Sequence, residues 1–271
     1  MVRLFTYAAS FSLFLLVACN STNSKTANEV SQTATSDTLS YTMETYRVES
    51  KLEKKPGDTI KEKTYFEASY PQFEDSLLNA YVQSILVYDY NPDIHFSTLK
   101  EAGEGFIKAY DDYQKLDYSS PWPWYNNRNI RVLENKPAYI SVGLDYDDFM
   151  GGAHGNHGTV FGNYDRNLKK EISLNDLIQE GKMDSLTLIA KEIFIKQEGI
   201  ENQEDAFKAY FFKDDTFALN DNFLLKDSTI QFLYNVYEIK PYASGITKLT
   251  IPYNNIKSLL TPKAKEILTI N

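Results

Sequence analysis

Apolar and polar residues alternate along the first part of the folded chain with a period of two, which is typical of a β-strand. The alternation covers residues 41–52 and returns over residues 64–68. Lys55-Pro56-Gly57-Asp58 lies between them and has the composition of a turn. The sequence therefore predicts an initial β-hairpin.

Apolar residues then recur at spacings of three and four, the period of a helix with one buried face. Pro71 opens the first such pattern, which continues to Leu86, and a second covers residues 97–113. Gly103 and Gly105 weaken the helical tendency of the second segment. The first helix is expected to pack on the hairpin.

The middle of the chain returns to strand patterns. Residues 121–125, Pro-Trp-Pro-Trp-Tyr, cannot continue a helix and are predicted to form an extended loop. Strands are predicted at residues 129–134, 138–146 and 159–164, and two of them flank a glycine-rich segment.

The last third mixes both patterns. Ser173 is a candidate helix cap, and a longer helix is predicted from Met183 to about Gln197, ended by Gly199. The remaining predicted elements are a helix at 204–212, a hairpin of strands at 222–225 and 229–234, a strand at 248–251 and a final helix opened by Pro252. Because strands and helices cluster rather than alternate, the predicted class is α+β, with two adjacent lobes of antiparallel sheet packed by helices.

The N-terminus has the features of an export signal. Residues 1–18 combine a charged start, a short apolar centre and small residues before Cys19. Leu16-Val17-Ala18-Cys19 has the form of a bacterial lipobox, so we expect lipid at Cys19 to anchor the chain to a membrane. A buried cysteine behind a simple signal peptide is the alternative. Residues 19–38 read as a flexible tether, and Asn20 favours an outer-membrane anchor facing the periplasm.

Composition narrows the possible partners. The chain has 271 residues with 28 basic and 37 acidic side chains, for a formal net charge of −9. Nucleic acid is disfavoured, because its recognition needs a basic surface. Cys19 is the one cysteine, which excludes an internal disulfide and a cysteine-ligated metal site.

Three segments resemble a known pair of domains. They are residues 145–155, residues 170–178 and residues 217–253, the last containing Tyr237-Glu238-Ile239-Lys240-Pro241-Tyr242-Ala243-Ser244-Gly245. Together they resemble the extracytoplasmic domains of unknown function found in the anti-sigma factor RsiV and the peptidoglycan deacetylase PdaC. The resemblance implies an N-terminal PdaC/RsiV-like domain over residues 39–165 and a C-terminal RsiV-like domain over residues 166–262.

In that family the module is a non-catalytic part of the envelope, and in RsiV-like proteins it binds lysozyme. We expect neither a sigma-binding segment before the signal nor a deacetylase domain after residue 271, so neither activity is transferred to this chain. Independent signs of catalysis are missing as well, because Cys19 is consumed by lipid and no Gly-x-Ser-x-Gly motif is present. No enzyme activity and no cofactor are predicted.

Residues 151–158 hold four glycines and two histidines, and three interpretations stay open. The first is a tight connection between two strands. The second is a loop whose backbone at Gly151 and Gly152, together with His154, contacts a ligand. The third is a metal site that combines His154 and His157 with nearby aspartates. Since no third ligand has motif spacing, no metal site is predicted.

Acidic and aromatic residues supply the other candidate contacts. Asp145, Asp147 and Asp148 are interpreted as a solvated strand edge, although an acidic surface would also attract a cationic partner. Trp122 and Trp124 could stack on sugar rings or anchor a protein interface.

The resulting hypothesis is a lipid-anchored envelope module that binds without catalysis and recognises a lysozyme-like protein. It would use the acidic surface, including Asp145 and Asp147, and the loop at residues 151–158. A peptidoglycan- or glycan-binding lipoprotein that uses the two tryptophans is the alternative. A metal-dependent envelope hydrolase that uses the two histidines is the third.

Overall fold

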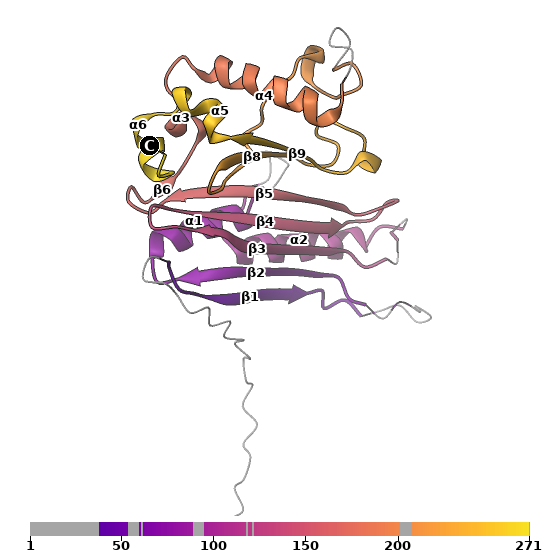
Figure 1. Ribbon diagram of the computed structural model, residues 1–271. Coiled ribbons are helices and arrows are strands. Elements are labelled where there is room, and N and C mark those ends of the chain that lie inside the picture. The colour runs from indigo at the N-terminus through magenta and orange to yellow at the C-terminus, as the bar shows by residue number, and fades with distance from the viewer. Residues whose placement is uncertain are drawn as a thin grey trace, which may run out of the picture.

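The computed structural model describes residues 38–53, 60, 62–88, 95–117, 119–120, 122–200 and 207–270. This part of the chain forms two sheets, one with the strand order β1-β2-β3-β4-β5-β6 and a smaller one with the order β7-β8-β9 (Figure 1). The predicted α+β class with two adjacent lobes is confirmed. The predicted signal segment, Cys19, the turn at 55–58 and nearly all of the tether lie outside the described residues.

Within each sheet, the strands of the described ranges lie side by side in the order in which they occur along the chain. Their bounds are β1 Tyr41–Glu49, β2 Tyr65–Phe73, β3 Tyr125–Asn135, β4 Tyr139–Phe149, β5 Asn156–Asp165, β6 Lys170–Glu171, β7 Phe223–Leu225, β8 Thr229–Tyr234 and β9 Thr247–Pro252. Every neighbouring pair is antiparallel except β2 and β3. A parallel pair needs a long crossover, which α1 and α2 supply.

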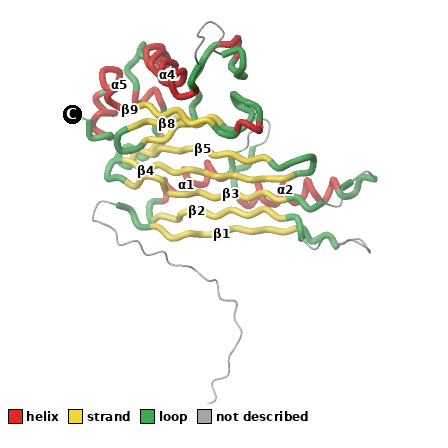
Figure 2. The backbone as a smooth tube through the Cα atoms, turned by 45° about the vertical axis from the view of Figure 1, so that its right-hand side comes forward, coloured by secondary structure: helices red, strands yellow, loops and turns green. Residues whose placement is uncertain are grey.

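The helices lie on the faces of the two sheets. Their bounds are α1 Ser76–Leu86, α2 Leu99–Tyr113, α3 Leu174–Leu177, α4 Met183–Glu198, α5 Tyr253–Ile256 and α6 Pro262–Ile267, with short 3-10 turns at Lys213–Asp215, Tyr242–Ser244 and Lys257–Leu259. Figure 2 shows α1 and α2 on one face of the large sheet and α4 beyond the small one. Within the described ranges, no helix combines the length and the apolar character needed to cross a bilayer.

Two hydrophobic cores follow from this arrangement. The first packs α1 and α2 on the large sheet and buries Phe66, Leu78, Leu86, Ile130 and Leu144. The second surrounds the small sheet and buries Leu186, Phe194, Leu225, Phe232 and Ile251. Because no disulfide is available, burial of these apolar side chains is the main stabilising contribution.

The predicted helix start at Pro71 is wrong. Pro71 lies inside β2, and α1 begins at Ser76 with the Asp75 side chain accepting hydrogen bonds from the first-turn amides. The strand tolerates proline because β2 pairs with β3 only through Ser69. Beyond that point one side of β2 is unpaired, so the missing N–H removes no ladder bond there.

The predicted helix at 204–212 is also wrong where it is described. Residues 207–209 form a turn and residues 210–212 are not helical, and residues 204–206 lie outside the described part. Phe207 and Phe212 are both buried against Phe194 of α4. On a helix, residues five apart lie about 140° from each other, so one helical face could not bury both rings.

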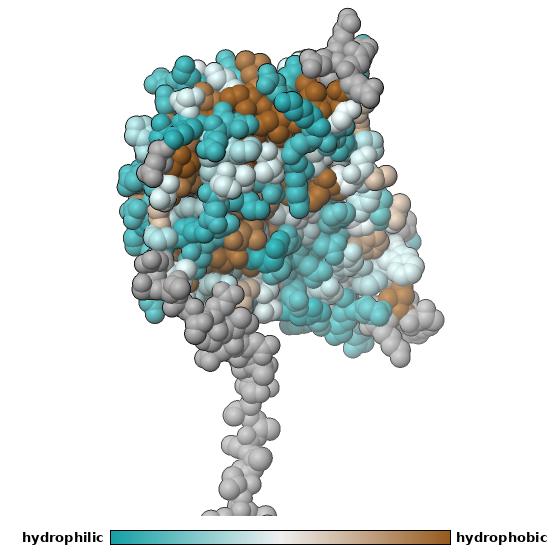
Figure 3. Space-filling model, in the orientation of Figure 1, coloured by the Kyte–Doolittle hydropathy of each residue, from teal (hydrophilic) through white to brown (hydrophobic). Residues whose placement is uncertain are grey.

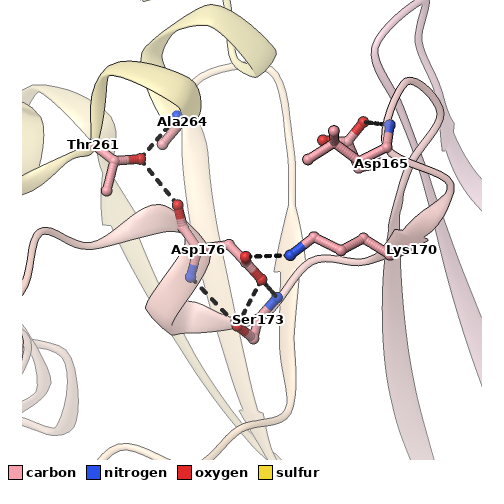
Figure 4. A network of polar contacts seen from close by, with 7 residues as sticks. Asp165, Lys170, Ser173, Asp176, Thr261 and Ala264 are labelled. Carbon is pink, nitrogen blue, oxygen red and sulfur yellow. Dashed lines mark hydrogen bonds and ion pairs between the residues drawn. The ribbon is translucent and has the colours of Figure 1, made fainter.

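The predicted cap at Ser173 is confirmed. The helix that it caps, α3, is also hydrogen-bonded to the start of α6 (Figure 4). Ser173 and Asp176 form a capping box, in which each side chain accepts a hydrogen bond from the other's backbone N–H. The Thr261 hydroxyl donates to the Asp176 carbonyl and accepts from the Ala264 N–H. Burial raises the pKa of the Asp176 carboxyl, but hydrogen bonds from Lys170 and Ser173 outweigh it and hold the pKa below its ordinary value.

Asparagine side chains join the two sheets along β5. Asn163 of β5 is 3% exposed, and its amide donates to the Phe223 carbonyl at 2.8 Å and accepts from the Leu225 N–H at 3.1 Å. Its oxygen also accepts from the Ser141 hydroxyl at 2.7 Å. The Asn163 amide therefore pairs with β7 as a strand backbone would.

Asn222 and Asn235 make the reciprocal contacts from the small sheet. The Thr159 N–H donates to Asn235 Oδ1 and the Phe161 N–H to Asn222 Oδ1, both at 2.8 Å. Both asparagine amides donate back to the Thr159 carbonyl. The short strand β6 pairs with β5 only at Tyr164 and Asp165, and before that point side chains thus satisfy the outer side of β5 where another sheet would use a strand.

We predict that Asn163→Ala lowers the free energy of unfolding by about 3 kcal/mol, because it leaves buried backbone groups of β7 without partners. Urea denaturation followed by circular dichroism measures this. Asn167→Ala, which changes an exposed asparagine two residues after β5, is the control and should alter stability by less than about 0.5 kcal/mol. Equal effects of the two substitutions would contradict the prediction.

Candidate functional site

Residues 150–155 connect β4 to β5, so the glycine-rich segment forms the strand connection that the first interpretation expected. Gly151 and Gly152 have φ of 95° and 98°, which side-chain-bearing residues rarely adopt. A Cβ on Gly151 would lie 3.7 Å from Trp124 Nε1. The structure therefore brings the glycine-rich connection and the Trp124 loop together.

His154 lies on this connection and meets the loop that precedes β9. Its ring stacks on Tyr242 with centroids 4.4 Å apart and an interplanar angle of 27°. Nδ1 lies 2.8 Å from the Gly155 carbonyl oxygen, which only accepts, so Nδ1 carries the proton. Nε2 is then free to accept from the Tyr237 hydroxyl at 3.3 Å.

His157 approaches the same tyrosine from β5. Its Nδ1 lies 3.3 Å from the Tyr242 hydroxyl, and the two rings meet edge to face at 5.4 Å. We call His154, His157, Tyr237 and Tyr242 the ring cluster. The sequence indicated the histidines, but it gave no sign that tyrosines about 85 positions later would contact them.

The loop between β8 and β9 that carries these tyrosines has one strained residue. Tyr237 has φ of 65°, a left-handed conformation that costs about 1 kcal/mol for a residue with a side chain. The turn is held by Asn235, whose N–H donates to the Glu238 carboxylate and whose carbonyl accepts from the Glu238 N–H. The turn keeps Tyr237 exposed to 54% and in contact with His154.

In the described ranges, His154 and His157 do not form a metal centre. No group of three His, Cys, Asp or Glu side chains there is placed to hold an ion. The Nδ1 atoms of both histidines are within hydrogen-bonding distance of other groups. The third interpretation of residues 151–158 therefore has no ligand set among the residues described.

The three aspartates of β4 do not form a strand edge, which corrects the sequence interpretation. β4 is paired on both sides, by β3 and β5. Asp145 bonds Arg131 at 2.6 Å and the Thr159 hydroxyl at 2.8 Å. Asp148 is 4% exposed, because successive side chains of a strand point to opposite faces.

Asp147 is the aspartate that stays exposed. It lies directly opposite His157 in the register of β4 and β5. Burial, and then the nearby Asp147 carboxylate, raise the pKa of the Tyr125 hydroxyl. Asp147 thus places negative charge beside the ring cluster.

The two tryptophans occupy different environments. Trp124 is half-buried and stacks on Tyr113 of α2 with centroids 5.2 Å apart, and Tyr110 and Phe106 contact it as well. Trp122 is 58% exposed. The extended loop that was predicted here therefore offers one free indole.

These features define one end of the molecule. The end of β4 and the start of β5 lie on the right in Figure 1, where the ring cluster meets them. We call Trp122, Met150, Asp147 and the ring cluster the exposed end, and Trp122, Met150 and Tyr237 are its exposed large apolar side chains. A separate hydrophobic region lies over α4 in Figure 3, where Leu188 is exposed.

Two family descriptions match the chain. Residues 57–157 match a family described as deacetylase PdaC, and residues 175–254 match DUF3298, a family of proteins of unknown function. No curated protein matches the chain significantly. The ring cluster draws its histidines from the first matched region and its tyrosines from the second.

Solved structures of the DUF3298 family share the fold. A member from Bacteroides fragilis NCTC 9343 is 22% identical, with a TM-score of 0.65 over 86% of this chain and 99% of that one. A DUF3298 family protein from Pseudomonas aeruginosa PAO1 is 23% identical, with a TM-score of 0.63 over 84% of this chain and 97% of that one. At these identities the likeness shows the fold alone.

We predict that Tyr242→Ala accelerates amide hydrogen exchange at residues 151–158 by about tenfold, or about 1.4 kcal/mol, because it removes the ring that both histidines contact. Mass spectrometry of proteolytic fragments measures this. Tyr88→Ala removes an exposed tyrosine outside the ring cluster and serves as the control. If both variants exchange at the wild-type rate, the ring cluster does not hold the connection in place.

Proposed function

Because the chain carries the PdaC/DUF3298-type pair of domains, we propose that it is a lipid-anchored, non-catalytic binding module of the cell envelope. In this proposal its two domains cover residues 39–165 and 166–262, and it recognises a cationic protein such as a lysozyme-like hydrolase. The exposed end is the binding surface.

The observation that carries the proposal is the composition of the exposed end. Protein interfaces gain most of their affinity from large, rigid aromatic side chains, and Tyr237 and Trp122 are both more than half exposed. Tyr237 is held by the hydrogen-bonded turn of Asn235 and Glu238 and by its contact with His154, so little further ordering is needed on binding.

Charge supports a cationic partner. The net charge of −9 attracts basic proteins at long range, and Asp147 adds negative charge at the exposed end itself. Such attraction raises the rate of encounter and weakens with salt.

The lipid anchor rests on the lipobox at Cys19 and on the tether that follows it. Acyl chains at one cysteine bind a bilayer because each buried methylene contributes about 0.8 kcal/mol. A flexible segment of this length gives a root-mean-square reach of roughly 25 Å. The folded part would thus stand close to the membrane, and we propose the outer membrane, facing the periplasm.

A glycan is the second candidate ligand, and the exposed indole of Trp122 favours it. Flat aromatic faces stack on sugar rings. Trp124 is less suited to this role, since Tyr113 stacks on it.

We predict that the full-length lipidated chain, in detergent micelles, binds immobilised lysozyme at about 0.02 M salt and at least about tenfold more weakly at about 0.3 M salt. Interferometry measures both affinities. The double substitution Trp122→Ala/Tyr237→Ala should weaken binding by about a hundredfold, as loss of two interface anchors does. Leu188→Ala, which changes a position on α4 that is also more than half exposed, should leave the affinity unchanged. No binding at low salt would refute recognition of lysozyme.

For the glycan candidate, the chain should co-sediment with purified peptidoglycan and lose this property in Trp122→Ala, while Trp124→Ala retains more of it. If neither substitution reduces co-sedimentation, the tryptophans are not part of the glycan-binding surface.

A further inference from the structure

A groove of about 490 Å³ lies where α1, β5 and the loops of the small sheet meet. Its volume falls within the range of about 300–1,000 Å³ that ligand sites occupy.

One wall of the groove is apolar and aromatic. Tyr81, Ile85 and Tyr88 project from α1 and from the residues directly after it, and Val160 and Phe161 belong to β5. The Tyr81 hydroxyl donates to the Asn163 carbonyl at 3.3 Å, which fixes its ring. This wall can cover an aliphatic stem or the face of a guanidinium group.

The groove also carries three carboxylates. They belong to Glu171, which lies beside the Tyr81 hydroxyl, and to Asp221 and Glu238, and no lysine or arginine is among the lining residues. In the part of the chain that the structure describes, none of these three carboxylates forms an ion pair. Elsewhere on the surface carboxylates do pair, as Asp75 does with Lys169.

One of these carboxylates is preorganised. The Glu238 carboxylate accepts from the Asn220 amide at 2.6 Å and from the Asn235 N–H at 2.8 Å. Asn222 and Asn235, the asparagines that hold β5 to the small sheet, also line the groove. A bound cation would therefore meet one carboxylate, that of Glu238, that is already in position.

We propose that this groove binds a lysine- or arginine-bearing segment of a protein partner, with the aliphatic stem against Tyr81 and Tyr88 and the cationic head between Glu171 and Asp221. Charge complementarity selects this occupant, because the groove combines an apolar wall with uncompensated negative charge. A neutral ligand would leave the carboxylates without a positive charge to pair with.

The groove is a second binding site, distinct from the exposed end, but the two share one turn. Asn235 and Glu238 face the groove, while Tyr237 between them contacts His154. A partner that fills both sites would contact the turn from two sides. The groove does not require that partner to be lysozyme-like.

The test uses the full-length chain and a fluorescein-labelled peptide, Gly-Lys-Gly-Lys-Gly, with fluorescence anisotropy as the readout. We expect saturable binding that weakens at least about tenfold in Glu171→Gln/Asp221→Asn, since two charge-assisted contacts are lost. The same peptide with acetylated lysines should not bind. Glu238 is left unchanged because it holds the turn.

The matched control is Glu44→Gln/Glu192→Gln, which removes the same charge from exposed positions on β1 and α4 and should bind the peptide as the wild type does. Equal weakening in both variants would show a general charge effect and overturn the proposal, as would equal binding by the wild type and the groove variant. Tighter binding of free spermidine than of the peptide would overturn the protein occupant.

Failure of the groove and failure of the exposed end are distinguishable. A chain that binds lysozyme with unchanged affinity after Glu171→Gln/Asp221→Asn, and binds no lysine peptide, loses the groove and keeps the proposed function. A chain that binds the peptide and not lysozyme keeps the groove and loses the proposed recognition of lysozyme.

Discussion

The structure depends on how the outer edge of β5 is satisfied. A strand edge carries N–H and C=O groups that must find partners, and the usual solution is another strand. Here the side chains of Asn222 and Asn235 take that place, and Asn163 reaches back to β7. These amide contacts hold the small sheet against the large one.

The ring cluster and the groove are both products of this junction. His154 and His157 come from the connection between β4 and β5, whereas Tyr237 and Tyr242 come from the segment between β8 and β9. The PdaC-type region alone would therefore hold the histidines without the tyrosines. In this chain the ring cluster therefore needs residues from both matched regions.

Local patterns predicted most of the elements, because alternation and helical spacing report burial directly. The Ser173 cap was predictable for the same reason, since its partner lies three residues away. Pro71 was misread because the signal that proline opens a helix ignores which strand edge is free. The contact of His154 with Tyr242 could not be predicted, because it depends on long-range packing that a single sequence does not contain.

The opposite edge of the large sheet is treated differently. Among the described residues, no strand lies outside β1 in the sheet, and its exposed Arg47 is paired with Glu49 and Glu67. Ionic side chains along an edge strand discourage the addition of a foreign strand, because docking would bury or separate the charges. One side of the sheet is therefore hydrogen-bonded to asparagine side chains, and the other carries ion pairs. Neighbouring copies at high concentration would thus be hindered from pairing their sheets edge to edge into aggregates.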